Sequence, residues 1–384
     1  MKPRDLICNL GEDMDTLKEY AFLPTEKYVK PLGRSFMLED CRVLSLSGSG
    51  VEFTYFGTKL EVLFYGDSTT KETDGPLPWR DFARVAVIVD DIKLLDTMIK
   101  KPAERFVVRG EDPSEAPAEH TVRILKLSEP RMSTAGLGEI KVLAGGEPKP
   151  TALSDKYIEF IGDSITCGYG VDAPSEWYPF STDTENVTEA FSYLTAKKLG
   201  ADYSMVSYSG HGLISGYTAD PDVPKIEELV QPYYEIFAYS YNTFRGMRLE
   251  ERKWNFSSER KPDTIVINLG TNDDSYVQRD ENKKAAFLED YAEFLEQVHE
   301  ANPESRIIVA FGLMGDALFD TENEAVSEFK EKSGFGDVHI CRLTPQNFEK
   351  NGYGADWHPS KASHETAADE LSAFIKSLGG RYAL

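Results

Sequence analysis

The chain has 384 residues, of which 41% are apolar, 21 are Phe and 19 are Tyr. This much apolar material in a chain of this length can bury the cores of two domains, which excludes a disordered or fibrous protein. The formal net charge is −23, from 65 acidic and 42 basic residues. Because an acidic surface repels phosphate groups, we expect no nucleic acid and no membrane as a partner.

The first part of the chain has the pattern of short strands separated by turns. In GVEFTYFG (50–57) apolar residues alternate with polar ones, and KLEVLFYGD (59–67) repeats this alternation. Further strands are predicted in 83–91, 120–128 and 138–143, and no long helical period interrupts them. The spacing predicts an antiparallel β-sandwich domain of jelly-roll type over residues 1–145.

The segment 144–155, AGGEPKPTALSD, is rich in Gly, Pro and small polar residues and indicates a domain boundary. Apolar strand-like runs then occur at 157–161, 202–208, 264–269, 306–311 and 338–343. Apolar residues recur at helical period in 287–298 and 367–378, and Gly379-Gly380 ends the second of these helices. Strands alternating with helices predict an α/β domain over 146–384, with a doubly wound parallel sheet.

Four short polar clusters follow strands or precede the last helix of this second domain. They are Gly-Asp-Ser at 162–164, Ser-Gly-His-Gly at 209–212, Gly-Thr-Asn-Asp at 270–273 and Asp-Trp-His-Pro at 356–359. In open parallel sheets, ligands bind beyond the carboxyl ends of the strands. The clusters therefore predict one site on one rim of the sheet.

The residue types in these clusters suit acyl transfer. Ser164 is the candidate nucleophile, and His358 is the candidate base that takes its proton. The oxyanion of a tetrahedral intermediate needs preorganised donors. We predict that the N–H groups of Ser164 and Gly210 and the side-chain amide of Asn272 form this oxyanion hole.

Four further residues near the clusters are candidates for contact with the substrate. Asp163 is expected to shape the turn at the nucleophile through backbone hydrogen bonds, and it is also counted among the substrate-binding residues. His211 either lines the cleft or is a plain polar loop residue. Tyr217 and Trp357 are candidates for a platform under a sugar ring, although aromatic residues are more often found in cores.

The four clusters together resemble those of the SGNH hydrolases, which carry a Ser, a Gly, an Asn and a His in four separated blocks in this order. GDSITCGYG from Gly162 and DWHPS from Asp356 are similar to the blocks of carbohydrate esterase family two. This resemblance spans essentially the whole chain. It implies a jelly-roll domain before the catalytic domain, and hydrolysis of acetyl esters on xylan or related oligosaccharides without a metal ion or organic cofactor.

One position departs from the SGNH pattern. Most of these enzymes have a carboxylate three residues before the histidine, where this chain has Ala355. Asp356 stands two residues before His358, and in an extended segment its side chain would point the same way as the ring. Either the Asp356 carboxylate holds the imidazole, which we favour, or a backbone carbonyl such as that of Trp357 does so and the unit is a Ser–His dyad.

Two other functions remain open from the sequence. One is a lipase, thioesterase or acyltransferase that uses the same four clusters, and the other is a non-catalytic carbohydrate-binding protein. The four cysteines lack metal-site spacing and favour free thiols in the cytoplasm, as does the absence of a signal-peptide-like apolar run in residues 1–20. The sequence leaves open whether the protein forms a homo-oligomer.

Overall fold

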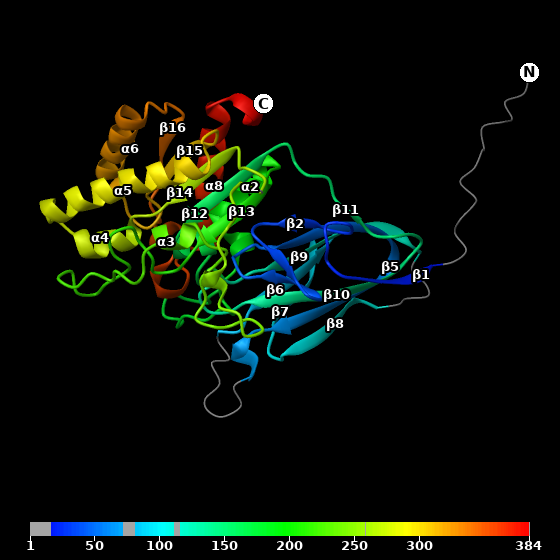
Figure 1. Ribbon diagram of the computed structural model, residues 1–384. Helices are drawn as coiled ribbons and strands as arrows, with labels where there is room; N and C mark the ends of the chain where they lie inside the picture. Colours follow the sequence, from blue (N-terminus) through cyan, green and yellow to red (C-terminus); the bar gives the residue numbers. More distant parts are fainter. Residues whose placement is uncertain (1–16, 72–80, 111–115, 258, 384) are drawn as a thin grey trace, which may run out of the picture.

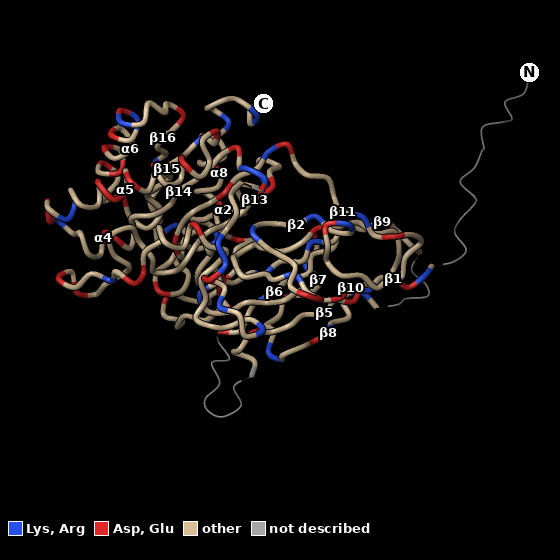
Figure 2. Tube along the Cα trace, in the orientation of Figure 1, with Lys and Arg blue, Asp and Glu red and all other residues tan. Residues whose placement is uncertain are grey.

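The computed structural model describes residues 17–71, 81–110, 116–257 and 259–383. An antiparallel sheet from the first part of the chain lies beside a parallel sheet that is flanked by helices (Figure 1). Acidic and basic residues are interspersed along both parts, and acidic residues are frequent on the helices α5 (Glu281–Ala301) and α6 (Phe319–Ser333) (Figure 2). Among the described residues, no helix has the length and apolar character needed to span a bilayer.

The first part of the chain is built from antiparallel strands, as predicted. Eleven strands lie in the described residues: β1 (Lys18–Phe22), β2 (Lys30–Leu32), β3 (Phe36–Leu38), β4 (Cys41–Leu44), β5 (Gly50–Gly66), β6 (Arg84–Val89), β7 (Ile92–Met98), β8 (Ala103–Arg109), β9 (Ala118–Lys126), β10 (Ala135–Ala144) and β11 (Lys149–Pro150). A 3₁₀ helix, η1, spans Ser68–Lys71. The jelly-roll connectivity and the domain boundary at residue 145 stay predictions.

The strand β5 runs through the middle of this sheet and replaces two predicted strands. Its alternating pattern buries Val51, Phe53 and Tyr55, in the first half of β5, in the same core as the apolar residues of the second half of β5. The predicted turn between separate strands at 50–57 and 59–67 is wrong, because one strand spans both segments. Gly57 does not make a turn there, because β5 and β10 approach so closely that a Cβ at this position would lie 2.0 Å from the Leu143 carbonyl oxygen.

The second part is the predicted α/β unit. Its five parallel strands run in the order β13 (Asp202–Ser207), β12 (Tyr157–Gly162), β14 (Thr264–Asn268), β15 (Arg306–Phe311) and β16 (Val338–Arg342). Apolar residues of α5 and α6 pack on one face, and those of α2 (Phe191–Leu199) and α8 (Lys361–Ser377) pack on the other. The parallel sheet is therefore covered on both faces, which explains its nearly continuous apolar strands.

Shorter helices lie in the connections of this unit and, in the case of η5, after α8. They are α1 (Ser164–Cys167), η2 (Val187–Glu189), α3 (Gln231–Tyr234), η3 (Leu249–Glu251), α4 (Thr271–Val277), α7 (Phe348–Asn351), η4 (Ala355–Trp357) and η5 (Gly380–Tyr382). Several of them follow the carboxyl ends of strands. α1 follows β12, and α4 follows β14.

The strand order predicts where a ligand-binding crevice lies. From β12 the chain moves to β13 on one side and then crosses to β14 on the other side. The connections that leave neighbouring strands in opposite directions open a crevice at their carboxyl ends. Ser164, Gly210 and Asn272 each lie in the connection that follows one of these three strands, so the fold brings three of the four predicted clusters to this crevice.

The antiparallel and parallel sheets share their buried cores. Val43 of β4 belongs to one apolar cluster with Phe237 and Phe244, and Leu125 of β9 belongs to another with Phe160 of β12. Shared cores hold two sheets in one fixed arrangement, because sliding them would expose apolar surface. The first part of the chain is therefore fixed against the parallel sheet.

Candidate active site

The nucleophile and base predicted from the sequence are in direct contact. Ser164 is the first residue of α1, directly after β12, and its side chain is almost fully buried. The Oδ1 atom of Asp163 accepts a hydrogen bond of 2.9 Å from the Ile165 N–H and so caps this short helix. The Nε2 atom of His358 lies 2.9 Å from Ser164 Oγ. The turn thus presents the hydroxyl to a base that comes from the far end of the chain.

The ring of His358 is held by backbone carbonyls. Its Nδ1 atom lies 3.1 Å from the Ala355 oxygen and 3.2 Å from the Asp356 oxygen. The expectation that the Asp356 carboxylate holds the ring is wrong. Asp356 and Trp357 have φ angles of 48° and 58°, so the segment is a tight turn and not an extended strand. The observed unit is the Ser–His dyad. The carbonyls that hold its ring are those of Ala355 and Asp356, and not that of Trp357 as suggested from the sequence.

Tyr169 supports the base from a second direction, a role that was not predicted from the sequence. Its ring stacks on the His358 ring with centroids 4.0 Å apart, and Phe180 stacks on its other face. Its hydroxyl donates a hydrogen bond of 2.7 Å to the Asp356 carboxylate. Its place in the Gly-Tyr-Gly triplet shortly after the nucleophile was the sequence feature that could have indicated this role. It holds the imidazole and the turn that carries it.

The environment keeps His358 neutral at ordinary pH. Burial is the main influence and lowers the pKa of His358 to about 4, while the hydrogen bonds to the Ala355 and Asp356 carbonyls act in the opposite direction. A neutral imidazole whose Nδ1–H is bound to carbonyl oxygens leaves Nε2 as an acceptor. It can therefore take the Ser164 proton.

The predicted oxyanion donors come from the connections that follow β12, β13 and β14, and Asn272 contacts Asp163, the residue before the nucleophile. Gly210 has a φ angle of +79°, which favours glycine. Within the described part of the chain, the N–H groups of Ser164 and Gly210 make no hydrogen bond. The Nδ2 atom of Asn272 donates 2.8 Å to the His211 carbonyl and lies 3.3 Å from Asp163 Oδ2. The contact with Asp163 is long, so the Asn272 amide hydrogen that points toward Asp163 is the one available to an oxyanion.

Asp163 lies beneath the nucleophile and not in the cleft. Its side chain is 1% exposed, so the prediction that it touches substrate is wrong, whereas its predicted role in the turn fits the observed cap. Burial raises the pKa of Asp163 to about 7, and the nearby Asp273 charge acts in the same direction. A carboxyl group that resists ionisation limits the repulsion of a negative charge forming near Asn272.

His211 is also buried, with 1% exposure, and the prediction that it lines the cleft is wrong. Its ring packs against the rings of Tyr208 and Tyr233, which also contact each other. Burial lowers the pKa of His211 to about 4, so the ring is neutral, and its Nδ1 lies 3.1 Å from the Ser209 carbonyl oxygen. The side chain thus supports the loop that carries Gly210.

Tyr217 and Trp357 are at the surface, as a sugar-binding role requires, with 61% and 44% exposure. Trp357 meets the more exposed Trp177 edge to face, with ring centroids 4.7 Å apart. The Tyr217 N–H donates 2.8 Å to the Gly210 carbonyl, and the Trp357 carbonyl accepts from Gln346. Contact of these rings with substrate stays a prediction.

Asp273 ties the third cluster to the loop that follows the second, a role that was not predicted from the sequence. Its Oδ1 atom accepts hydrogen bonds from three successive N–H groups, those of Leu213, Ile214 and Ser215, at 2.8, 2.7 and 3.2 Å. Burial raises the pKa of Asp273 to about 6, which these three bonds oppose. The residue beside Asn272 therefore fixes the loop that follows Gly210.

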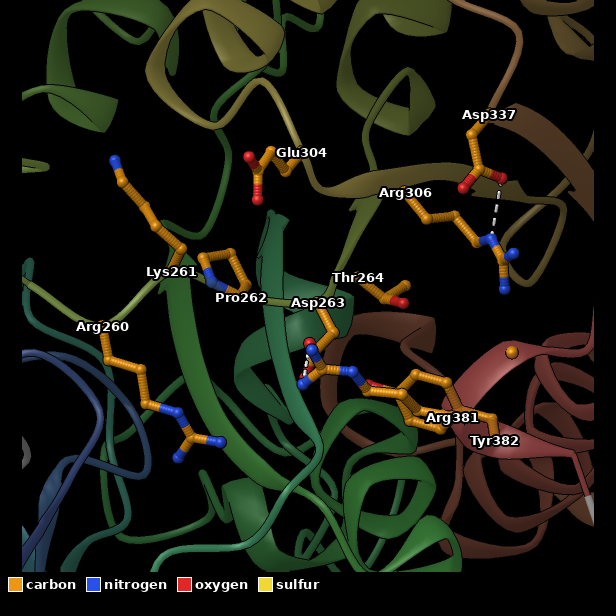
Figure 3. Close-up of a pocket in the computed structure, with 11 residues that line it drawn as sticks. Arg260, Lys261, Pro262, Asp263, Thr264, Glu304, Arg306, Asp337, Arg381 and Tyr382 are labelled. Atoms are coloured by element: carbon orange, nitrogen blue, oxygen red, sulfur yellow. Dashed lines mark hydrogen bonds and ion pairs between the residues drawn. The ribbon is translucent and has the colours of Figure 1, made fainter.

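A surface depression of about 430 Å³ lies at the opposite end of the parallel sheet (Figure 3). It includes Thr264 and Arg306, the first residues of β14 and β15. Two of its basic side chains are already paired, because Arg306 binds Asp337 at 2.8 Å and Arg381 binds Asp263 at 2.7 Å. Its lining holds no serine, cysteine or histidine, so it lacks a nucleophile and base of the kind that Ser164 and His358 provide.

One group of side chains in the described ranges has the spacing of a metal site, namely Glu129, Cys167 and Glu185. All three are buried, and the buried ammonium group of Lys126 interacts with each of them electrostatically. The lysine supplies the positive charge that a metal ion would bring to these acidic groups. The cluster does not fit a metal ion, and no catalytic step is assigned to one.

Comparison with known proteins identifies the class to which this site belongs. Residues 160–366 match the GDSL-like lipase/acylhydrolase family. This match covers more than half of the chain, so the chain belongs to that family. The resemblance to the SGNH hydrolases, drawn from the clusters around Ser164, Gly210, Asn272 and His358, is confirmed.

Individual relatives extend the similarity over the first part of the chain. The cellulase/esterase CelE of Acetivibrio thermocellus is 31% identical over 341 residues, which cover 87% of this chain and 37% of CelE. An acetylxylan esterase/glucomannan deacetylase of Cellvibrio japonicus is 29% identical over 99% of both chains. A family two carbohydrate esterase from Clostridium thermocellum, solved with cellohexaose, is 26% identical, with a TM-score of 0.75 over 91% of this chain and 98% of that one.

The carbonyl-held imidazole makes the Asp356 side chain dispensable. In Asp356→Asn, the amide oxygen can still accept from Tyr169, and asparagine tolerates the positive φ angle. We expect kcat for acetate release to change by less than about threefold, whereas loss of a carboxylate that holds the ring costs about 10⁴-fold. Steady-state kinetics of the purified variant check this, and a loss above about a thousandfold would restore the carboxylate to the catalytic unit.

The low pKa of His358 predicts an acid-tolerant activity profile. The ring accepts a proton only when neutral, so kcat/KM should be level from neutral pH downward and fall as the pH drops through about 4. Initial rates across pH 3–9, with circular dichroism to exclude acid unfolding, measure this limb. The Asp163→Asn variant keeps the oxygen that caps α1 but cannot ionise, so it distinguishes an effect of Asp163 ionisation on the profile from that of His358. A midpoint near 6.5 in both proteins would contradict the assignment.

Asn272 should be needed for the transition state and not for substrate binding. Removal of one oxyanion donor typically lowers turnover by about 100- to 1,000-fold, so Asn272→Ala should lose kcat in this range with little change in KM. Asp274→Asn, two residues along the same helix, is the control and should stay near wild type. A loss of less than about threefold in Asn272→Ala would remove Asn272 from the oxyanion hole.

Proposed function

We propose that this protein is a serine esterase that hydrolyses acetyl esters on carbohydrate, with acetylated xylan or related oligosaccharides as substrates. The observation that carries the proposal is the contact of 2.9 Å between Ser164 Oγ and His358 Nε2, beside the Gly210 and Asn272 donors. The relatives named as acetylxylan esterases support the choice of acyl group and substrate class.

In the first half of the reaction, the Ser164 oxygen attacks the ester carbonyl carbon while His358 Nε2 takes the hydroxyl proton. The tetrahedral oxyanion receives hydrogen bonds from the Ser164 and Gly210 N–H groups and the Asn272 amide. When the carbonyl re-forms, the bond to the sugar oxygen breaks and His358 gives its proton to that oxygen. The products of this half are an acetyl-Ser164 ester and a free sugar hydroxyl.

In the second half, water takes the place of the sugar. Neutral His358 accepts a proton from the water as its oxygen attacks the acetyl carbonyl, and the same donors hold the second oxyanion. Collapse of this intermediate breaks the bond to Ser164 Oγ, which regains a proton from His358. Acetate leaves, and the dyad returns to its starting state.

The exposed aromatic rings at the rim support a sugar as the leaving group. Trp177, Trp357 and Tyr217 offer apolar faces of the kind on which sugar rings pack. A net charge of −23 does not hinder a neutral oligosaccharide. A lipase, thioesterase or acyltransferase would differ from this proposal in its acyl substrate, with longer acyl chains preferred. A non-catalytic binding protein would differ in having no turnover.

We further propose a cytoplasmic location, which the free thiols of Cys41, Cys167 and Cys341 support. Cys8 lies outside the described residues. Cell fractionation with an antibody to the protein tests the location, and recovery in the medium would contradict it. Whether the protein is a homo-oligomer is decided by light scattering on the purified chain.

The function is tested by acetate release from acetylated xylo- and gluco-oligosaccharides, with acyl esters of increasing chain length as a second series. We expect turnover on the acetylated sugars that falls as the acyl chain lengthens, and loss of at least about 10⁴-fold in Ser164→Ala, because the nucleophile is gone. Ser275→Ala, a serine on α4 that contacts the Asn272 carbonyl, is the matched control. Highest rates on long acyl chains, or an active Ser164→Ala, would overturn the proposal.

A further inference from the structure

The peptide group between Ser209 and Gly210 is held by the antiparallel part of the molecule. The connection between β9 and β10, residues 127–134, reaches over to the loop that follows β13. Two side chains of this connection, Arg131 and Glu129, bind the backbone of Ser209 from its two sides. The residue that precedes the oxyanion donor thus has backbone partners in the other part of the chain, in addition to the contact of 3.1 Å between its carbonyl oxygen and His211 Nδ1.

Arg131 uses its guanidinium group as a three-way clamp. Its Nη1 donates 2.6 Å to the Ser209 carbonyl oxygen, its Nη2 donates 2.7 Å to Glu228 Oε1, and its Nε donates to the Tyr241 hydroxyl. The guanidinium also lies over the Tyr241 ring, 5.0 Å from its centroid. Its side chain is only 16% exposed, so its position is set by these contacts and not by solvent.

The atom that Arg131 binds belongs to the same peptide group as the Gly210 N–H. A peptide unit is planar, with its C=O and N–H on opposite sides, so fixing the oxygen fixes the direction of the N–H. A cation at the oxygen also polarises the unit and makes its N–H a stronger donor. The Gly210 N–H is one of the three proposed oxyanion donors, and it makes no hydrogen bond to the described residues.

Glu129 and neighbouring backbone bonds make the clamp rigid. The Oε2 atom of Glu129 accepts 2.8 Å from the Ser209 N–H. The Glu129 N–H itself donates to Glu185, and its carbonyl accepts 2.7 Å from Lys126 Nζ. The Arg131 carbonyl in turn accepts 2.9 Å from the Tyr241 N–H. The connection is therefore tied at several points to the part of the chain that carries the nucleophile.

We propose that Arg131 is a positioning residue for the oxyanion hole: it orients and polarises the Ser209–Gly210 peptide, so that the antiparallel part of the molecule completes the catalytic site. This inference rests on the proposed esterase function. Arg131 does not touch the reacting atoms. It acts on the transition state through the Gly210 N–H, and substrate binding in the ground state does not depend on it.

The test compares Arg131→Gln with Arg245→Gln in the full-length protein. Arg245 is a matched control, because it also joins the two parts of the chain through acidic residues, Glu39 and Asp40, and lies 4.6 Å from the centroid of a tyrosine ring, that of Tyr65. It makes no contact with Ser209. Thermal melting of both variants reports any loss of folding, and Arg131→Lys, which keeps the charge without the fork, is a second probe.

Acetate release should show a loss that falls on kcat. We expect Arg131→Gln to lose about tenfold to a hundredfold in kcat with KM changed by less than about twofold, because a donor is misplaced but not deleted. Arg131→Lys should lie between this variant and wild type, and Arg245→Gln should stay near wild type. Methylboronic acid, whose adduct on Ser164 places an oxygen in the hole, should bind the Arg131 variants more weakly by a similar factor.

Two results would overturn the inference while leaving the esterase function in place. One is equal kcat in Arg131→Gln and Arg245→Gln, and the other is a rise in KM with kcat unchanged, which would make Arg131 a substrate contact. If Ser164→Ala keeps wild-type acetate release in the same assay, the proposed function fails, and the inference fails with it. The Ser164 variant therefore separates the two failures.

Discussion

The hydrogen bond between Ser164 and His358 is the contact on which the site depends, and it imposes a demand on the whole fold. The two residues are separated by 194 positions in the chain, and their contact requires the connections after β12 and before α8 to meet at the same rim. A parallel sheet meets this demand, since all of its strands end on the same side. The crossing from β13 to β14 then opens the crevice in which the acyl group can sit.

The chemistry of the dyad follows from the burial of its imidazole and from the groups that orient the ring. His358 is oriented by backbone carbonyls and by a tyrosine ring, and not by an ionised carboxylate. Burial outweighs the opposing effects of the carbonyl hydrogen bonds and of the Asp356 charge, so the imidazole stays neutral, which suits a base. When the ring becomes charged during the reaction, the two carbonyl dipoles stabilise it, although less than a full negative charge would.

Buried carboxyl groups beneath the site carry out structural work. Asp163 caps the helix that starts at the nucleophile, and Asp273 ties down the loop after Gly210 through three N–H groups. Glu129 does the same for Ser209 from the other part of the chain. Each carboxyl oxygen satisfies backbone donors that tight loops leave unpaired. The loops that form the oxyanion hole are therefore held rigid before the substrate arrives.

Much of this protein was determined by its sequence alone. The alternation of strands and helices, the antiparallel first part and the four clusters follow from local pattern, because periodicity and turn residues act over a few positions. Ser164, His358, Gly210 and Asn272 could be named since each follows or adjoins a recognisable element. The continuous strand β5 could not be foreseen, because Gly57 marks a close approach of two strands that only the paired sheet reveals.

The tertiary structure alone decided how the side chains around the dyad point. The turn at Asp356 has positive φ angles, which sends its carboxylate to Tyr169 and brings two carbonyls to the ring. The burial of Asp163 and His211 depends on neighbours distant in sequence. The clamp of Arg131 on Ser209 joins residues 78 positions apart. Such contacts arise from packing between elements, and no local pattern encodes the direction of a side chain toward a partner in another part of the chain.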